Sequence, residues 1–222
     1  MKKLYCLAAL ALSVFLAQAQ TDELDLYLSS HGMVNVSRMD SSLMADFKYA
    51  TDDNFMGRAV YRGLTSVWLH PDAANKLLKA SDLLKNRRKG YRLLVYDAAR
   101  PMFVQRQMWD LVKRTAKVNY VSNPANGGGL HNYGMAVDIT IVDPSGRLLD
   151  MGTAFDFFGE EAHINNEDYL LNTGKISHEA YLNRRLLRGI MREAGFTTII
   201  YEWWHFNACS RNVARRDYRV IE

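Results

Sequence analysis

The chain has 222 residues, of which 48% are hydrophobic, 23% charged and 11% aromatic. This composition is that of an ordinary globular protein with one sizeable domain or at most two small ones, and it excludes a low-complexity or repeat protein. The net charge of +4 is too small to indicate a nucleic-acid partner, and the basic run at 85–90 ends a helical pattern, where positive charge suits the helix dipole.

Residues 1–19 have the pattern of a secretory signal peptide. Lys2 and Lys3 precede a short apolar stretch at 7–17, and Ala17-Gln18-Ala19 fits a cleavage site. The stretch is too short for a membrane-spanning helix; the alternative is a buried N-terminal helix. We therefore expect an exported protein with a periplasmic location, and no membrane insertion after cleavage. Cleavage would leave Cys209 as a lone cysteine, which excludes an intrachain disulfide.

The mature chain is predicted to form one α+β domain over residues 20–222, with a central, mostly antiparallel sheet flanked by helices. Residues 20–42 are polar and are expected to be irregular. Alternation predicts a strand over 43–50, and apolar residues at helical spacing predict a helix from Pro71 that Gly90 ends. A second strand is predicted over 91–98, and Pro101 is well placed in the first turn of a second helix that carries Phe103, Val104, Met108, Leu111 and Val112.

The second half of the chain contains the remaining predicted elements. The sequence MAVDITIV predicts a strand over 135–142. Residues 144–176 are expected to be rich in loops. Ser177 can cap a helix that runs to about Ala194, before Gly195. The β-branched and aromatic segment 197–206 predicts a further strand.

Two of these segments contain a histidine close to a carboxylate. Asp138 lies within the apolar strand at 135–142 and is preceded by His131, while His205 follows Glu202 in YEWWHF. A buried carboxylate is costly unless it is paired or binds a cation. Two histidines and one aspartate suit zinc and leave a fourth coordination position open, and Glu202 would then be the natural general base. The spacing alone leaves open a salt-bridged Asp138 and an edge-strand Glu202.

The spacing also sets a geometric condition on this metal site. The intervals of seven residues from His131 to Asp138 and of three from Glu202 to His205 are both odd, so a regular strand would place each pair on opposite faces. Both pairs converge only if His131 lies in the turn before its strand, which Gly134 permits, and if the chain bends between Glu202 and His205. We therefore predict a bulge or a strand end in the second segment.

The sequence resembles the zinc D,D-peptidases at these positions. HNYGMAVD (131–138) is similar to their H-x-x-G-x-A-x-D motif, and EWWH (202–205) is similar to their E-x-W-H motif. Within that group, YATDDNFMG (49–57), YDAARP (96–101), LDMGTAFD (149–156) and EWWHF resemble the D-alanyl-D-alanine dipeptidases of the vancomycin-resistance type. The matching blocks extend from about residue 43 to 207.

The resemblance implies a role for five residues. His131, Asp138 and His205 would bind one zinc ion per chain. Glu202 would take a proton from zinc-bound water and pass it to the leaving amine, and Arg100 would stabilise the oxyanion. Without the resemblance, Arg100 would be interpreted as a surface arginine at a helix start. The implied substrate is the small dipeptide D-alanyl-D-alanine.

The chain departs from the family pattern at one position. Relatives commonly have a serine two residues before the first histidine, where this chain has Gly129, so a hydroxyl contact to substrate is either missing or supplied elsewhere. Asn54 and Asp156 lie in matching blocks and receive no firm role. His163 and His178 have no partner pattern and are interpreted as structural or exposed.

Two alternatives to the dipeptidase hypothesis stay open. One is a D,D- or L,D-carboxypeptidase that trims peptidoglycan stem peptides. The other is a binding module that zinc stabilises but that has no catalytic activity. The presence of both Glu202 and Arg100 argues against the module, because a structural zinc site needs neither and is normally closed by four protein ligands.

Overall fold

The computed structural model describes residues 23–222, so the signal peptide predicted over residues 1–19 lies outside the described part. The α-helices are α2 (Glu23–Ser30), α3 (Val36–Met39), α4 (Pro71–Arg87), α5 (Met102–Val112), α6 (Glu167–Asn172), α7 (His178–Glu193) and α8 (Arg211–Asp217). The strands are β1 (Val34–Asn35), β2 (Met44–Ala45), β3 (Trp68–Leu69), β4 (Arg92–Asp97), β5 (Ala136–Val142), β6 (Thr197–Thr198) and β7 (His205–Asn207). Short 3-10 helices are η1 (Lys48–Ala50), η2 (Ala116–Tyr120), η3 (Pro124–Asn126), η4 (Leu130–Tyr133) and η5 (Glu160–Ala162).

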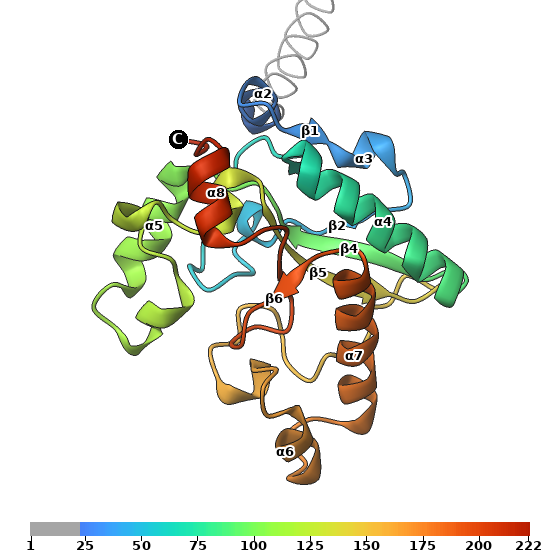
Figure 1. Cartoon of the computed structure of the whole chain (residues 1–222). Coiled ribbons are helices and arrows are strands. Elements are labelled where there is room, and N and C mark those ends of the chain that lie inside the picture. The colour runs from blue at the N-terminus through green and yellow to red at the C-terminus, as the bar shows by residue number, and fades with distance from the viewer. Residues whose placement is uncertain (1–22) are drawn as a thin grey trace, which may run out of the picture.

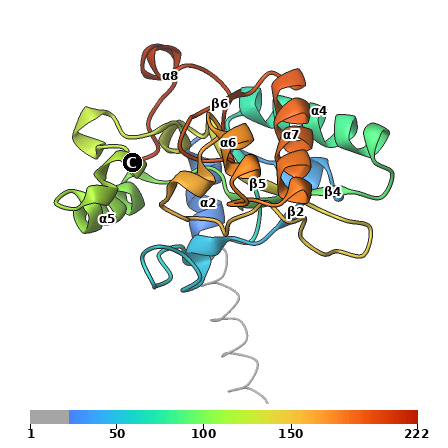
Figure 2. The same cartoon turned by 90° about the horizontal axis from the view of Figure 1, so that it is seen from below.

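The predicted α+β class is confirmed. A five-stranded sheet has the order β2-β4-β5-β7-β6, and each neighbouring pair is antiparallel except β2 with β4. β1 and β3 form a separate antiparallel pair. Helices α4 and α7 contact each other, and Figures 1 and 2 show them side by side, with α5 at the opposite end of the molecule. No helix within residues 23–222 combines the length and the apolar character that crossing a membrane requires.

The long helices form where the apolar spacing predicts them. In α4, Pro71 occupies the first turn, and the buried residues Ala73, Leu77, Ala80 and Leu84 recur on one face. In α7, the Ser177 side chain accepts a hydrogen bond from the backbone N–H of Ala180 and so caps the helix. The buried faces of both helices pack with β4 and β5 into the main core.

Several sequence predictions are wrong in detail. Residues 20–42 are not irregular, because α2, β1 and α3 lie within their described part. The strand predicted over 43–50 consists only of β2, after which the chain turns into η1 and buries Tyr49. In α5, Phe103 and Leu111 are exposed although they were expected on the apolar stripe. α2, Tyr49 and the buried face of α5 belong to a second core, whereas Val36 and Leu43 belong to the main core. The periodicity of a single segment does not reveal these tertiary contacts.

The segment 197–206 is also not one strand. It forms the hairpin strands β6 and β7, in which Thr198 pairs with Phe206, and residues 199–204 make the connection. The aromatic residues that suggested a continuous strand are buried in this connection instead: Trp203 and Trp204 both belong to the main core. The predicted strand end between Glu202 and His205 is therefore confirmed, since β7 begins at His205.

Candidate active site

His131 reaches the sheet from the short helix η4, in the turn before β5. Gly134 ends η4 in a left-handed conformation with φ of +64°, which an L side chain rarely adopts. A Cβ at this position would overlap the Met33 side chain and lie 2.8 Å from the backbone nitrogen of His70. The turn therefore requires glycine for both its backbone angle and its packing, and it sets His131 at the start of β5 as predicted.

The strand register brings Asp138 and His205 to the same face of the sheet. Asp138 of β5 pairs directly with His205 of β7 on one side and with Asp97 of β4 on the other. Directly opposed residues in antiparallel strands project to the same face. The three side chains therefore form one row across three neighbouring strands, and this row explains why residues far apart in the sequence meet.

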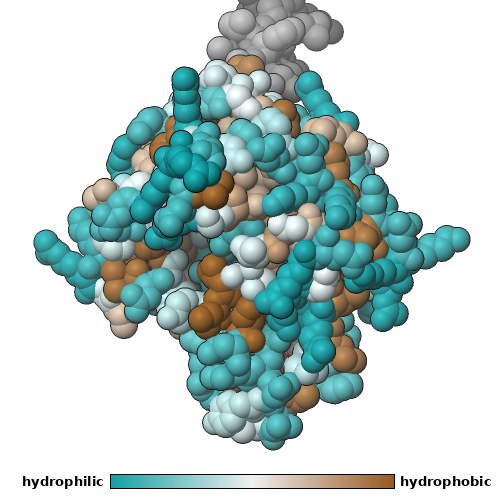
Figure 3. Space-filling view, in the orientation of Figure 1, coloured by the Kyte–Doolittle hydropathy of each residue, from teal (hydrophilic) through white to brown (hydrophobic). Residues whose placement is uncertain are grey.

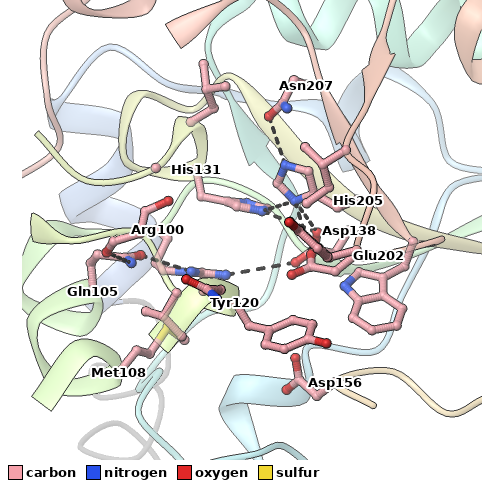
Figure 4. A pocket seen from close by; sticks show the side chains of 18 of the residues that line it. Arg100, Gln105, Met108, Tyr120, His131, Asp138, Asp156, Glu202, His205 and Asn207 are labelled. Carbon is pink, nitrogen blue, oxygen red and sulfur yellow. Dashed lines mark hydrogen bonds and ion pairs between the residues drawn. The ribbon is translucent and has the colours of Figure 1, made fainter. Parts of the chain in front are cut away.

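The side chains of His131, Asp138 and His205 converge on one point (Figure 4). Asp138 Oδ1 lies 2.9 Å from His205 Nδ1 and 3.3 Å from His131 Nε2, and the two histidine nitrogens are 3.1 Å apart. One donor atom from each residue lies within 4.8 Å of the other two, so the set can hold a metal ion. The site residues that the sequence predicted for the metal are thus brought together.

The outer nitrogen of each histidine is engaged by an acceptor. His131 Nδ1 donates to the carbonyl oxygen of Ala98 at 2.7 Å, and His205 Nε2 donates to Oδ1 of Asn207 at 2.8 Å. These bonds fix the tautomers, so the lone pairs of His131 Nε2 and His205 Nδ1 both face Asp138. Such outer contacts are typical of histidines that bind a metal.

Asp138 is held in its charged form. Burial raises the pKa of its carboxyl, but positive charge on His131 and His205, or on a cation bound between them, outweighs burial and holds this pKa well below its usual range. A ligating carboxylate must be ionised, so the charge state matches the one that a metal site requires.

Glu202 lies in the connection between β6 and β7, next to the three donors. Its Oε2 atom is 3.9 Å from His205 Nδ1, and its side chain is buried. Burial raises the pKa of Glu202 to about 8, although His205 acts in the opposite direction. A carboxyl group with a pKa near neutrality is suited to accept and return a proton, and a bound cation nearby would favour its ionised form.

Arg100 is buried, so the interpretation as a surface arginine is wrong. Asp97 Oδ2 accepts hydrogen bonds from Arg100 Nε at 2.9 Å and from Nη2 at 2.5 Å, while Gln105 accepts one from Nη1 at 3.0 Å. Burial lowers the pKa of Arg100, but Asp97 outweighs it and keeps this pKa well above the ordinary value. Arg100 Nη2 lies 3.9 Å from Asp138 Oδ2, so a fixed positive charge faces the candidate metal site.

These groups line a cavity of about 440 Å³. Tyr49 and Asp156 form part of its wall, and Figure 4 shows Asp156 on the side of the pocket away from Gln105 and Asn207. The Asp156 carboxylate accepts a hydrogen bond from the Tyr49 hydroxyl at 3.1 Å and one from the backbone N–H of Phe55 at 3.2 Å. Burial raises the pKa of Asp156 to about 7.

The other residues singled out in the sequence have structural positions. Asn54 donates to three backbone carbonyl oxygens of its own loop, at Lys48, Thr51 and Arg58, so it stabilises that loop rather than lining the cavity. His163 is hydrogen bonded to the Tyr120 hydroxyl at 3.1 Å, and His178 is exposed at the start of α7. Cys209 is free and half-buried against the core.

Sequence reasoning missed the residues that orient the site. Asn207 holds His205, whereas Asp97 and Gln105 hold Arg100. A polar residue two positions after His205 on a strand shares its face, and Asp97 precedes Arg100 at the end of a strand, so both had weak local indications. Nothing in the local sequence indicated Gln105, because its contact with Arg100 forms only once the first turn of α5 has folded.

Three convergent metal-binding donors, a buried carboxyl group and a fixed guanidinium in one pocket are the arrangement of a metal-dependent hydrolase. Comparisons with known proteins identify the group more narrowly. A family model described as D-ala-D-ala dipeptidase matches residues 29–222. The chain therefore belongs to the D-Ala-D-Ala dipeptidase family, and its activity is that of a peptidase.

The relatives of the chain come from several bacteria. It is 33% identical to the D-alanyl-D-alanine dipeptidase of Escherichia coli (strain K12) over 174 residues, which cover 78% of this chain and 83% of the relative. It is 32% identical to the D-alanyl-D-alanine dipeptidase of Enterococcus faecium over 182 residues, which cover 72% of this chain and 83% of the relative. The corresponding protein of Enterococcus faecalis is 27% identical over 196 residues, which cover 79% of this chain and 91% of the relative.

Proposed function

We propose that the chain is an exported zinc-dependent dipeptidase that hydrolyses D-alanyl-D-alanine to free D-alanine. The observation that carries this proposal is the convergence of His131, Asp138 and His205 beside Glu202 and Arg100 in one pocket. The names of the relatives support the dipeptide as the substrate.

The donor set fits one zinc ion. Two imidazole nitrogens and one carboxylate oxygen are ligands that zinc prefers, and three protein ligands leave a position for water or substrate. Other divalent ions also bind nitrogen and oxygen donors, so the choice of zinc belongs to the proposal. When bound, zinc would polarise the scissile carbonyl group and make the attacking water more acidic.

Two side chains would carry out the steps that belong to the protein itself. Glu202 would take a proton from the attacking water and return it to the leaving amine. Arg100 would stabilise the negative charge that develops on the carbonyl oxygen. Its guanidinium is held by Asp97 and Gln105 before substrate arrives, so it does not have to reorganise during the reaction.

Asp156 would bind the ammonium group of the dipeptide. It is a carboxyl group in the wall of the same pocket, and Tyr49 and the backbone of Phe55 fix its position. An ammonium group beside Asp156 would favour the charged form of its carboxyl group. The resulting ion pair would offset the free-energy cost of burying that charge. A pocket that pairs with the free amino end discriminates against substrates extended at that end, which favours a dipeptide over a long stem peptide.

Export is proposed from the pattern of residues 1–19 alone. Outside the cytoplasm, in a periplasm, the enzyme would act on dipeptide released from peptidoglycan rather than on the precursor of the cell wall. Fusion of residues 1–22 to a reporter that folds only outside the cytoplasm tests this assignment, and a reporter active only in the cytoplasm would contradict it.

The activity is tested with the purified, zinc-loaded protein. We expect release of D-alanine from D-alanyl-D-alanine, and we expect Glu202→Ala to lose most of this activity while it keeps the metal. A strong preference for a pentapeptide stem over the dipeptide would replace the proposal with a carboxypeptidase. Loss of stability on chelation, with no hydrolysis across a panel of peptides, would indicate the zinc-stabilised binding module instead.

A further inference from the structure

The pocket wall near His131 is made by two segments that have no part in the reaction described above. Gly129 lies at the start of η4, and Ser122 lies after η2. Arg211, the first residue of α8, lines the same pocket and donates a hydrogen bond from Nη2 to the Ser122 hydroxyl at 3.2 Å. A hydroxyl group and a guanidinium group therefore meet at the pocket wall.

Gly129 relieves close packing and is not needed for its backbone conformation. Its φ of −102° and ψ of 178° are extended values that any residue adopts. A Cβ at position 129, however, would lie 3.1 Å from the Ser122 hydroxyl oxygen and 3.3 Å from the Ser122 Cβ, which is tighter than ordinary contact. The glycine makes room for Ser122, so a hydroxyl group reaches this part of the wall from position 122 rather than from position 129.

Arg211 has different partners from the other arginines of α8. Arg216 pairs with Asp217 at 2.7 Å, and Arg215 donates to the carbonyl oxygen of Asn126. Within residues 23–222, the Arg211 side chain has only its bond to the neutral Ser122 hydroxyl. Arg211 is exposed, so its guanidinium is accessible to an anion from solvent. The surface over α8 is hydrophilic on the face shown in Figure 3.

Ser122 is also connected by hydrogen bonds to Arg100, the residue proposed to stabilise the oxyanion. Its carbonyl oxygen accepts a hydrogen bond from Gln105 Nε2 at 2.7 Å, and Gln105 Oε1 accepts one from Arg100 Nη1 at 3.0 Å. Gln105 is buried, so this connection fixes Ser122 relative to Arg100. The backbone of Ser122 is thus tied to Arg100 through Gln105, and the Ser122 hydroxyl accepts its hydrogen bond from Arg211.

We infer that Ser122 and Arg211 form a subsite for the free terminal carboxylate of the substrate, and this inference rests on the dipeptidase function proposed above. A guanidinium and a hydroxyl can both donate to one carboxylate, and charge-assisted hydrogen bonds of this kind are strong. Asp156 would take the ammonium end and this subsite the carboxylate end, with the candidate metal site between them. The subsite would recognise the terminal carboxylate of a dipeptide and of a longer peptide alike, while Asp156 would restrict the length.

The subsite is tested by binding, separately from hydrolysis. D-Alanyl-D-alanine and its C-terminal amide are titrated into the zinc-loaded Glu202→Ala protein, with and without Arg211→Gln or Ser122→Ala. We expect Arg211→Gln to weaken binding of the acid by about 10- to 100-fold, which is the size of a hydrogen bond to a charged group, and to leave the affinity for the amide nearly unchanged. Arg216→Gln, which removes the same charge from the same helix, is the matched control and should affect neither ligand.

A second pair of variants tests the spatial relationship. Gly129→Ser should weaken binding of the acid because the new side chain displaces Ser122, and adding Ser122→Gly should restore most of it. An equal loss for acid and amide in Arg211→Gln, or an unchanged affinity for the acid, would overturn the subsite, as would the absence of binding of the acid to the Glu202→Ala protein. Failure of the wild-type protein to hydrolyse a dipeptide that it binds would overturn the proposed function and leave the subsite standing.

Discussion

His205 donates a hydrogen bond from Nε2 to Oδ1 of Asn207, which lies two residues further along β7, at a distance of 2.8 Å. Residues at this spacing project from the same face of a strand. In the neutral imidazole this bond leaves Nδ1 without a proton, and His205 Nδ1 faces Asp138 Oδ1, 2.9 Å away. The orientation of one candidate ligand is therefore set by its own strand.

Replacing Asn207 should loosen the candidate metal site. Asn207→Ala removes the acceptor, and contacts of this kind contribute about 10- to 100-fold to metal affinity or activity. We expect weaker zinc binding by this factor in a competition assay with a chromophoric chelator. Asn207→Asp keeps an acceptor and should retain zinc; an affinity that falls equally in both variants would contradict an orienting role for the side-chain oxygen.

Arg100→Lys should lower kcat although it keeps the positive charge. A lysine cannot reproduce the bonds that the guanidinium makes to Asp97 and Gln105, so the charge is no longer fixed where the oxyanion forms. Loss of a stabilising donor of this type costs about 10²- to 10³-fold in kcat. Steady-state kinetics on the dipeptide measure the effect, and Arg106→Lys, at an exposed arginine of α5, is the control. A change in KM alone would argue against the assigned role.

Asp97→Ala should destabilise the fold strongly. Asp97 is fully buried, and its removal leaves the Arg100 charge and the Tyr61 hydroxyl without their partner. Breaking a buried ion pair in this way costs about 3–5 kcal/mol. Urea unfolding with metal bound measures the loss. Asp217→Ala breaks the exposed pair with Arg216 and should change the free energy of unfolding little; comparable losses in both variants would be the contrary result.

Gly134→Ala should cost more than the same change at another left-handed glycine. Gly134 and Gly174 have similar φ angles, +64° and +70°, but a Cβ at 134 overlaps Met33 whereas a Cβ at 174 has no atom within 4 Å. Gly174→Ala should therefore lose only the conformational cost, about 1–2 kcal/mol. Thermal unfolding compares the two, and zinc affinity should fall only in Gly134→Ala, because the turn places His131. Equal unfolding costs would show that packing at Gly134 adds nothing.

The stability of the protein without substrate should depend on Asp156 between about pH 4 and pH 7. Burial raises its pKa to about 7 from an ordinary value of 3.8, so the folded state holds the proton where the unfolded state has released it. The contribution of Asp156 to the free energy of unfolding is therefore largest below this window and is lost as pH rises through it. The difference in stability between wild type and Asp156→Asn, measured by urea unfolding, should fall over this range and then level off. A difference that rises with pH would show the opposite sign.

Much of the fold could be predicted from local sequence. The helices at 71–87 and 178–193 and the strands at 92–97 and 136–142 follow apolar spacing that was visible in the chain, and their buried faces explain why. The hairpin of β6 and β7 could not be predicted from propensity, because Trp203 and Trp204 favour a strand and are used in the connection between two strands. Only their burial in the tertiary core determines that conformation.

Some residues of the candidate site could be predicted from sequence motifs, and others could not. The three metal donors and Glu202 have motifs with fixed spacing, and the odd intervals even indicated the turn at Gly134 and the strand end before His205. Asp97, Gln105 and Ser122 are brought to the site by pairing and packing between distant segments. No periodicity within one segment carries that information.

The position of Glu202 outside the strands has a consequence for how this scaffold can change. The metal donors Asp138 and His205 are locked together by the register of β5 and β7, whereas Glu202 depends on the connection at 199–204. A substitution or a change of length in that connection would displace the base and leave the donors in place. Hydrolysis and metal binding are therefore separable traits in evolution, and a descendant of this chain could become a metal-dependent receptor for the same peptides through changes in a single hairpin loop.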